Sequence, residues 1–174
     1  MAWLYHADYL YCSRAYSRGY YGWISYGLLY ANEELLTGTE GQVPRYTDQR
    51  HTLSFVNDID LGKRWAMNLL FNYGSGFAVT PYTSRYNEKQ ARYEWIAGKT
   101  NSEHMTAYKR VDVRISREFS LFSMPAYVFV EASNLLNAKN IYDYRYRYDS
   151  NGTPYRQEIE LFPFIPSLGM SVKF

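Results

Sequence analysis

The residues best suited to bind a ligand lie in a tyrosine-rich segment near the end of the chain. Tyrosines alternate with charged residues there, and Asn151-Gly152 follows as a two-residue hairpin signal, because both residue types tolerate positive φ. Aromatic rings and guanidinium groups suit sugars, siderophores or peptides. The candidate ligand contacts are Tyr142, Tyr144, Arg145, Tyr146, Arg147 and Tyr148. The alternative is a hairpin that the rings stabilise through cross-strand pairs.

Side chains that could perform catalysis or bind a metal are scattered. The histidines His6, His51 and His104 have no HxH or HxxxH spacing. Cys12 has no CxxC companion. Asp48 with His51 is the only local Asp–His pair expected on the outer loops, and neither a GxSxG nor a GxxxxGK[ST] sequence occurs. We therefore expect a protein that is not an enzyme and has no catalytic residue, cofactor or metal site.

The composition describes a chain in which apolar and polar residues are finely mixed. Of its 174 residues, 19% are aromatic, whereas the mean hydropathy is −0.46. The formal charge is +2, and no basic block could follow a phosphate backbone, which excludes nucleic acid as a partner. No apolar run approaches the ~18 residues of a transmembrane helix, so any membrane crossing must use strands. The first residues lack the basic and apolar regions of an export signal.

Period-two alternation of apolar and polar residues recurs along the chain and predicts β-strands with two different faces. Between Trp65 and Tyr73, apolar or aromatic side chains occupy every second position. In residues 110–116, Val and Ile alternate with Arg, Asp and Ser. Seven strands are predicted, at residues 3–12, 20–32, 49–61, 64–75, 106–118, 125–148 and 153–174. No boundary divides the chain, so residues 1–174 form one domain.

The predicted connections alternate in length. Residues 60–63 and 119–125 are short links, whereas residues 37–46 and 74–105 are long and polar. Short turns on one side and long loops on the other are typical of bacterial outer-membrane barrels. The aromatic ends of the strand at 65–73 suit the two headgroup levels of a bilayer, which ~9–11 tilted residues cross. The predicted fold class is all-β, an antiparallel transmembrane β-barrel segment with short periplasmic turns and long extracellular loops.

The last predicted strand gives a second indication of the outer membrane. Its alternating apolar series is similar to the C-terminal signal that outer-membrane proteins present to their assembly machinery. The residues of this assembly signal are Leu168, Met170, Val172 and Phe174. A soluble all-β domain with the same alternation would instead keep its aromatic residues in a core.

Several motifs, in order, resemble the barrel of the TonB-dependent receptors. Leu136 departs from the family's pattern, which usually has Phe at this position of its "NLFN" segment. The motifs that carry the resemblance are Gly22-Trp-Ile-Ser-Tyr26, Asp48-Gln-Arg-His-Thr-Leu53, Leu61-Gly-Lys-Arg-Trp65, Tyr73-Gly-Ser-Gly-Phe77 with Thr80-Pro-Tyr82, Tyr108-Lys-Arg-Val-Asp-Val-Arg114, Glu131 to Asn137, and Pro166-Ser-Leu-Gly-Met-Ser-Val-Lys-Phe174.

The resemblance implies a C-terminal part of a 22-stranded barrel that surrounds a plug. Because seven strands cannot close that barrel and nothing resembles the plug or the TonB-binding box, the sequence is expected to be a fragment. The implied location is the outer membrane of a Gram-negative bacterium. The implied partners are outer-membrane lipid, the barrel assembly machinery, the missing plug and strands, and TonB through that plug. The implied function is energised uptake of a scarce nutrient: a siderophore, cobalamin, a metal chelate or an oligosaccharide.

Two other classes of protein remain open. One is a self-contained small barrel of 8 strands in the outer membrane, structural or enzymatic, in which residues 142–160 would have to cross the membrane. The other is a soluble β-barrel that binds a small apolar ligand.

Overall fold

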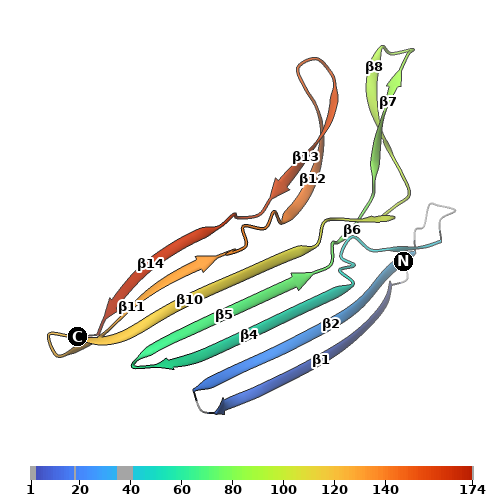
Figure 1. Cartoon of the computed structure of the whole chain (residues 1–174). Coiled ribbons are helices and arrows are strands. Elements are labelled where there is room, and N and C mark those ends of the chain that lie inside the picture. The colour runs from blue at the N-terminus through green and yellow to red at the C-terminus, as the bar shows by residue number, and fades with distance from the viewer. Residues whose placement is uncertain (1–2, 18, 35–40, 174) are drawn as a thin grey trace.

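The fold is a single large antiparallel sheet with smaller hairpins at one end (Figure 1). The structure, a computed structural model, describes residues 3–17, 19–34 and 41–173. Seven strands form the continuous path of the sheet, so the predicted all-β antiparallel fold is confirmed. In spatial order they are β1 (Trp3–Ser17), β2 (Tyr20–Glu34), β4 (His51–Gly62), β5 (Trp65–Gly74), β10 (Tyr108–Leu121), β11 (Met124–Ser133) and β14 (Ile165–Val172).

The register of the sheet sorts side chains into one apolar face and one polar face. Directly paired residues point to the same side, and successive residues of a strand point to opposite sides. One row is wholly apolar across the five strands from β4 to β14: Ile59, Met67, Ile115, Val130 and Leu168. The adjacent row is wholly polar: Asp58, Asn68, Arg114, Glu131 and Ser167. We call the two sides the apolar face and the polar face.

Neither face is covered by a second layer of structure. On the apolar face, Leu168 is 77% exposed and Val130 is 59% exposed. The buried apolar residues among those described are small: Ala31, Val43, Ala78 and Ala126. The accessible surface is 12418 Å², whereas a globular protein of 20.5 kDa exposes about 8,900 Å². The sheet therefore has no hydrophobic core of its own, and its apolar face requires a partner other than water.

Two of the short turns hold non-glycine residues in the left-handed conformation. Lys63 and Arg64 join β4 to β5 with φ of 53° and 66°. Phe122 and Ser123 join β10 to β11 with φ of 49° and 67°. Positive φ at both central residues defines a type I′ hairpin, whose twist matches that of the strands. Most residue types other than Gly, Asn and Asp adopt this conformation at a cost.

The three long connections lie at the opposite end of the sheet. The first contains β3 (Gln42–Pro44), which pairs with β2. The second contains β6 (Ala78–Val79), β7 (Tyr82–Asn87), β8 (Arg92–Ala97) and β9 (Glu103–His104). The third contains β12 (Ile141–Tyr148) and β13 (Pro154–Glu160). Hairpins β7–β8 and β12–β13 both project beyond this end, so the predicted separation of short turns from long loops is confirmed (Figure 1).

Two predicted strands were too long. Residues 125–148 divide into β11 and β12, and residues 153–174 divide into β13 and β14. Asn134 and Asn137 adopt φ of 50° and 46°, which ends β11. The predicted Asn151-Gly152 two-residue turn is also wrong, because only Gly152 has positive φ. The Asp149 carboxylate instead accepts bonds from the backbone N–H groups of Asn151 and Thr153, at 2.9 and 2.7 Å, and closes a wider loop.

Replacing Phe122-Ser123 by Asn-Gly should stabilise the β10–β11 hairpin. Asn and Gly adopt the left-handed conformation at lower cost, so the free energy of unfolding should rise by about 1–2 kcal/mol. Chemical denaturation followed by circular dichroism measures the change. Phe122→Ala is the control: the ring is 86% exposed, and Ala keeps the conformational cost. An equal gain in this control would show that the ring, and not the turn conformation, was the cause.

Candidate functional site

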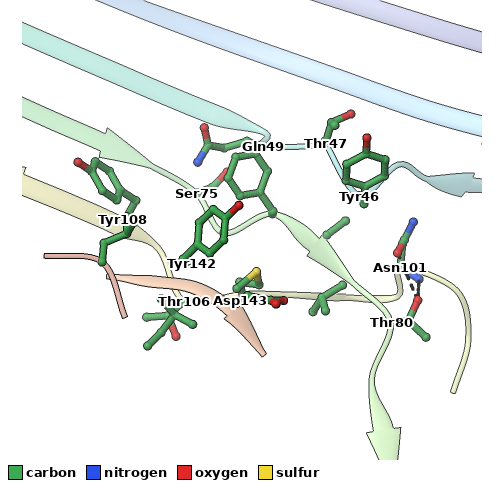
Figure 2. A pocket seen from close by; sticks show the side chains of 17 residues that line it. Tyr46, Thr47, Gln49, Ser75, Thr80, Asn101, Thr106, Tyr108, Tyr142 and Asp143 are labelled. Atoms are coloured by element: carbon green, nitrogen blue, oxygen red, sulfur yellow. Dashed lines mark hydrogen bonds between the residues drawn. The ribbon is translucent and has the colours of Figure 1, made fainter. Parts of the chain in front are cut away.

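A cavity of about 510 Å³ lies where the long connections meet the sheet (Figure 2). All three connections contribute to its walls: Tyr46 and Gln49 before β4, Phe77 after β5, and Tyr142 and Asp143 from β12. Its size falls within the ~300–1,000 Å³ typical of small-molecule sites. It is the candidate ligand-binding site of the described part of the chain.

The cavity opens at the end of the polar face. Gly74 pairs with both Thr52 and Tyr108, which places these three residues on that face. The Gln49 amide occupies the space beside Gly74, where a Cβ atom would lie 2.4 Å from Nε2. Gln49 and Tyr108 both line the cavity. A ligand in it would therefore sit above the polar face and away from the apolar face.

A buried ion pair fixes the segment that carries Tyr46 and Gln49. Asp48 is fully buried, and its Oδ2 lies 2.8 Å from Nη2 of Arg50. Its backbone carbonyl also accepts a bond from Ala78 N–H at 3.3 Å. The hydrogen bond to Asp48 raises the pKa of Arg50, and the guanidinium carbon lies 4.0 Å from the centre of the Tyr30 ring. A charged buried pair of this kind holds its loop firmly, because separating it would leave an unpaired buried charge.

The Asp48 and His51 side chains do not form a dyad. Asp48 bonds to Arg50, whereas His51 Nδ1 lies 2.8 Å from the Tyr26 hydroxyl. Among the described residues no group of three or more His, Cys, Asp or Glu side chains could hold a metal ion. Cys12 is an exposed free cysteine.

Two segments of the backbone approach each other closely at Gly76, which lines the cavity. A Cβ at this position would lie 1.6 Å from the carbonyl oxygen of Met105. Met105 N–H also donates to the carbonyl of Phe77 at 2.9 Å. The strand exit after β5 and the segment before β10 therefore pack backbone to backbone, which only glycine permits.

Buried asparagines connect the loops to one another. Asn101 donates to the carbonyl of Pro44 at 2.8 Å. Asn140 accepts a bond from Lys109 N–H at 2.8 Å and donates to the Lys109 carbonyl at 2.9 Å. Asn134 exchanges bonds of 3.0 Å with the backbone of Ala138. None of these asparagines was predicted as a site residue from the sequence. The pattern that could have indicated them is the concentration of Asn near strand ends, where side-chain amides replace the interrupted hydrogen bonds of the sheet.

The structure distributes the six candidate ligand contacts among different environments. Tyr142 alone lines the cavity, and its side chain is exposed. Tyr144 stacks on Arg156 at 4.4 Å. Tyr148 lies 6.4 Å from Trp95, in a second hollow. Arg145 and Arg147 are exposed and alternate with the tyrosines along β12.

Tyr146 links two hairpins that are far apart in the sequence. Its ring centre lies 4.9 Å from that of Trp95 in β8 and 4.7 Å from that of Tyr82 in β7. Within its own hairpin, Tyr146 pairs with Arg156. The aromatic contacts of this tyrosine therefore join hairpin β12–β13 to hairpin β7–β8, whereas the sequence suggested pairs across a single hairpin.

The candidate assembly signal lies on the edge strand β14. Leu168, Met170 and Val172 pair with Val130, Val128 and Ala126 and belong to the apolar face. Phe174 lies outside the described residues. No helix among the described residues is long and apolar enough to span a membrane.

Comparison with family models, curated proteins and solved structures finds no match to this chain. The resemblance to TonB-dependent receptors stays a prediction from the sequence motifs.

Gly76→Ala should destabilise the cavity floor, because its Cβ would meet a backbone carbonyl that cannot move independently. The expected cost is about 1–3 kcal/mol, that of overpacking. Gly74→Ala is the matched control, since its Cβ would meet only the mobile amide end of Gln49. Hydrogen exchange of residues 76–79 and 103–105 measures the effect. Equal exchange in the two variants would contradict the proposed close approach.

Trp95→Ala should separate the two projecting hairpins. Loss of the ring contacts with Tyr146 and Tyr148 removes about 1 kcal/mol or more per pair, so amide exchange in β12 and β13 should accelerate. Tyr93→Ala, in the same strand, removes only a contact within hairpin β7–β8, the one with Tyr86 at 5.1 Å. If Tyr93→Ala accelerated amide exchange in β12 and β13 to the same extent, a specific role for Trp95 would be refuted.

Proposed function

We propose that this chain is part of the wall of an outer-membrane β-barrel of the TonB-dependent receptor type, which takes up a scarce nutrient. The observation that carries the proposal is the uncovered apolar face of a seven-stranded antiparallel sheet, with the long loops gathered at one end. Lipid hydrocarbon is the partner that such a face fits, since both are apolar and lipid requires no complementary shape.

The dimensions of the apolar face support this assignment. From Trp65 to Tyr73 the strand is about 27 Å long at ~3.4 Å per residue. At the tilt of a barrel strand, this length spans about 20 Å along the barrel axis, close to the ~25 Å apolar band of outer-membrane proteins. Arg117 lies 5.2 Å from the Trp65 ring at one end, and Lys109 pairs with Tyr73 at the other. Rings and cations at both ends suit the two headgroup levels.

The motifs that suggested the family occupy structurally distinct positions. Asp48 to Leu53 leads into β4, and Leu61 to Trp65 forms a short turn. Tyr108 to Arg114 begins β10. The segment at Glu131 to Asn137 ends β11 through the buried Asn134. These four motifs thus coincide with strand ends or a turn, which supports the resemblance.

The edges of the sheet favour a larger assembly. Within the described residues, β1 and β14 each pair with one neighbour of the path. In lipid, unpaired backbone groups along such an edge cost several kcal/mol each. The proposed receptor therefore contains further strands. By its resemblance to the family, it also contains a plug, reaches TonB through that plug, and enters the outer membrane through the barrel assembly machinery.

A self-contained barrel of eight strands fits the topology less well. It would need residues 142–160 to cross the membrane, but β12 and β13 pair only with each other and lie outside the large sheet. The hairpin belongs instead with the outer loops of the proposed receptor.

Two adjacent leucines on opposite faces test the proposal. Leu69 belongs to the apolar face, whereas Leu70 belongs to the polar face and pairs with Asp112. With the chain folded into phospholipid vesicles, Leu69→Arg should cost about 2–4 kcal/mol, the penalty for arginine near the bilayer midplane. Leu70→Arg should cost far less, because its guanidinium lies beside a carboxylate and away from lipid. Urea unfolding in vesicles measures both. Equal costs for the two variants would refute the membrane assignment.

A further inference from the structure

The wall of the 510 Å³ cavity carries no positive charge. Of the 17 residues that line it, all within the described chain, none is Lys, Arg or His, and Asp143 is the only ionisable acid. Four aromatic rings contribute to the wall: Tyr46, Phe77, Tyr108 and Tyr142. An anionic ligand would therefore meet no fixed cation in the wall and one carboxylate, which disfavours its binding.

The arginines next to the wall are each paired with an acid. Arg45, beside Tyr46, lies 3.6 Å from Glu33. Arg50, beside Gln49, lies 2.8 Å from the buried Asp48. Arg110, two residues after Tyr108, lies 2.7 Å from Asp112. Because each positive charge is largely neutralised by its partner, these arginines give the cavity little attraction for an anion.

The polar groups of the wall suit a ligand with many hydroxyl groups. Thr47 and Thr106 contribute hydroxyls, Gln49 an amide and Asp143 a carboxylate. Figure 2 shows the Tyr46, Gln49 and Tyr142 side chains around one opening. Hydroxyls and amides both donate to and accept from sugar hydroxyls, carboxylates accept from them, and aromatic faces cover the apolar C–H faces of sugar rings.

We infer that this cavity binds an uncharged, hydroxyl-rich ring ligand, the chemistry of a short neutral oligosaccharide. Among the nutrients named in the sequence analysis, this inference selects the oligosaccharides and disfavours anionic metal chelates. The inference rests on the proposed function, because it takes the cavity as the site at which the outer loops of the receptor bind the nutrient. Tyr142 provides a stacking face at the mouth, and Asp143 beside it accepts hydroxyl protons and repels anions.

Saturation-transfer NMR on the whole chain, folded in lauryldimethylamine oxide micelles, tests the inference. The probes are maltotriose and cellotriose as neutral trimers and trigalacturonic acid as their anionic counterpart. At least one neutral trimer should bind, and the anion should bind about tenfold more weakly or not at all. Absence of binding by both neutral trimers, or equal binding of the anion, overturns the inference.

Variants connect the binding to this cavity. Tyr142 is 70% exposed, so Tyr142→Ala should fold normally and weaken binding of the neutral trimer about tenfold, whereas Tyr142→Phe should retain it. Asp143→Lys should shift the preference toward the anion. Tyr155→Ala, an exposed tyrosine of β13 outside the cavity, is the control and should leave binding unchanged. Unchanged binding in Tyr142→Ala would overturn the assignment to this cavity.

The two proposals fail in different measurements. The Leu69 and Leu70 variants report on lipid and do not involve the cavity. A chain that inserts in vesicles but binds neither neutral trimer would refute the saccharide class alone. A chain that binds maltotriose but shows equal costs for Leu69→Arg and Leu70→Arg would refute the membrane proposal and would leave the cavity chemistry supported.

Discussion

The alternation of side chains across a single-layered sheet is the constraint on which the rest of this structure depends. A sheet without a second layer must match each face to whatever surrounds it, and here neighbouring rows differ completely in polarity. In the five strands from β4 to β14, the row through Met67 and Ile115 is apolar, and the next row, through Asn68 and Arg114, is polar. A shift of one residue in any strand would exchange its faces, so the pattern also fixes the register.

The loop end depends on the same register through a small number of buried polar groups. Asp48 and Asn134 lie where strands begin or end. The Asp48 carbonyl accepts a bond from Ala78 N–H and joins the first connection to the second, whereas the Asn134 side chain bonds the backbone of Ala138 and Phe162 within the third. Polar anchors suit this position because directional hydrogen bonds determine the geometry of the backbone groups that they join.

The sequence predicted those features that depend on local periodicity. The strand from Trp65 to Tyr73, the two faces and the order of short and long connections all follow from alternation and turn-forming residues. The interruption at Asn134 was missed, because alternation continues on both sides of it and only a left-handed φ ends the strand. The contact between Tyr146 and Trp95 was missed for a different reason. It joins two hairpins separated by the whole of β10 and β11, and no local pattern specifies such a pair.

The direction of the two edge strands limits what can complete the sheet. With seven antiparallel strands in the path, β1 and β14 both run from the loop end toward the turn end. Joined to each other, these two strands would form a parallel pair. A wall that closes this sheet with antiparallel pairing throughout must supply an odd number of strands, the first and last of which run toward the loop end. A second copy of the sheet has the required odd number of strands, but in the same orientation its first and last strands run toward the turn end, so strand direction rules out antiparallel closure by two copies in that orientation.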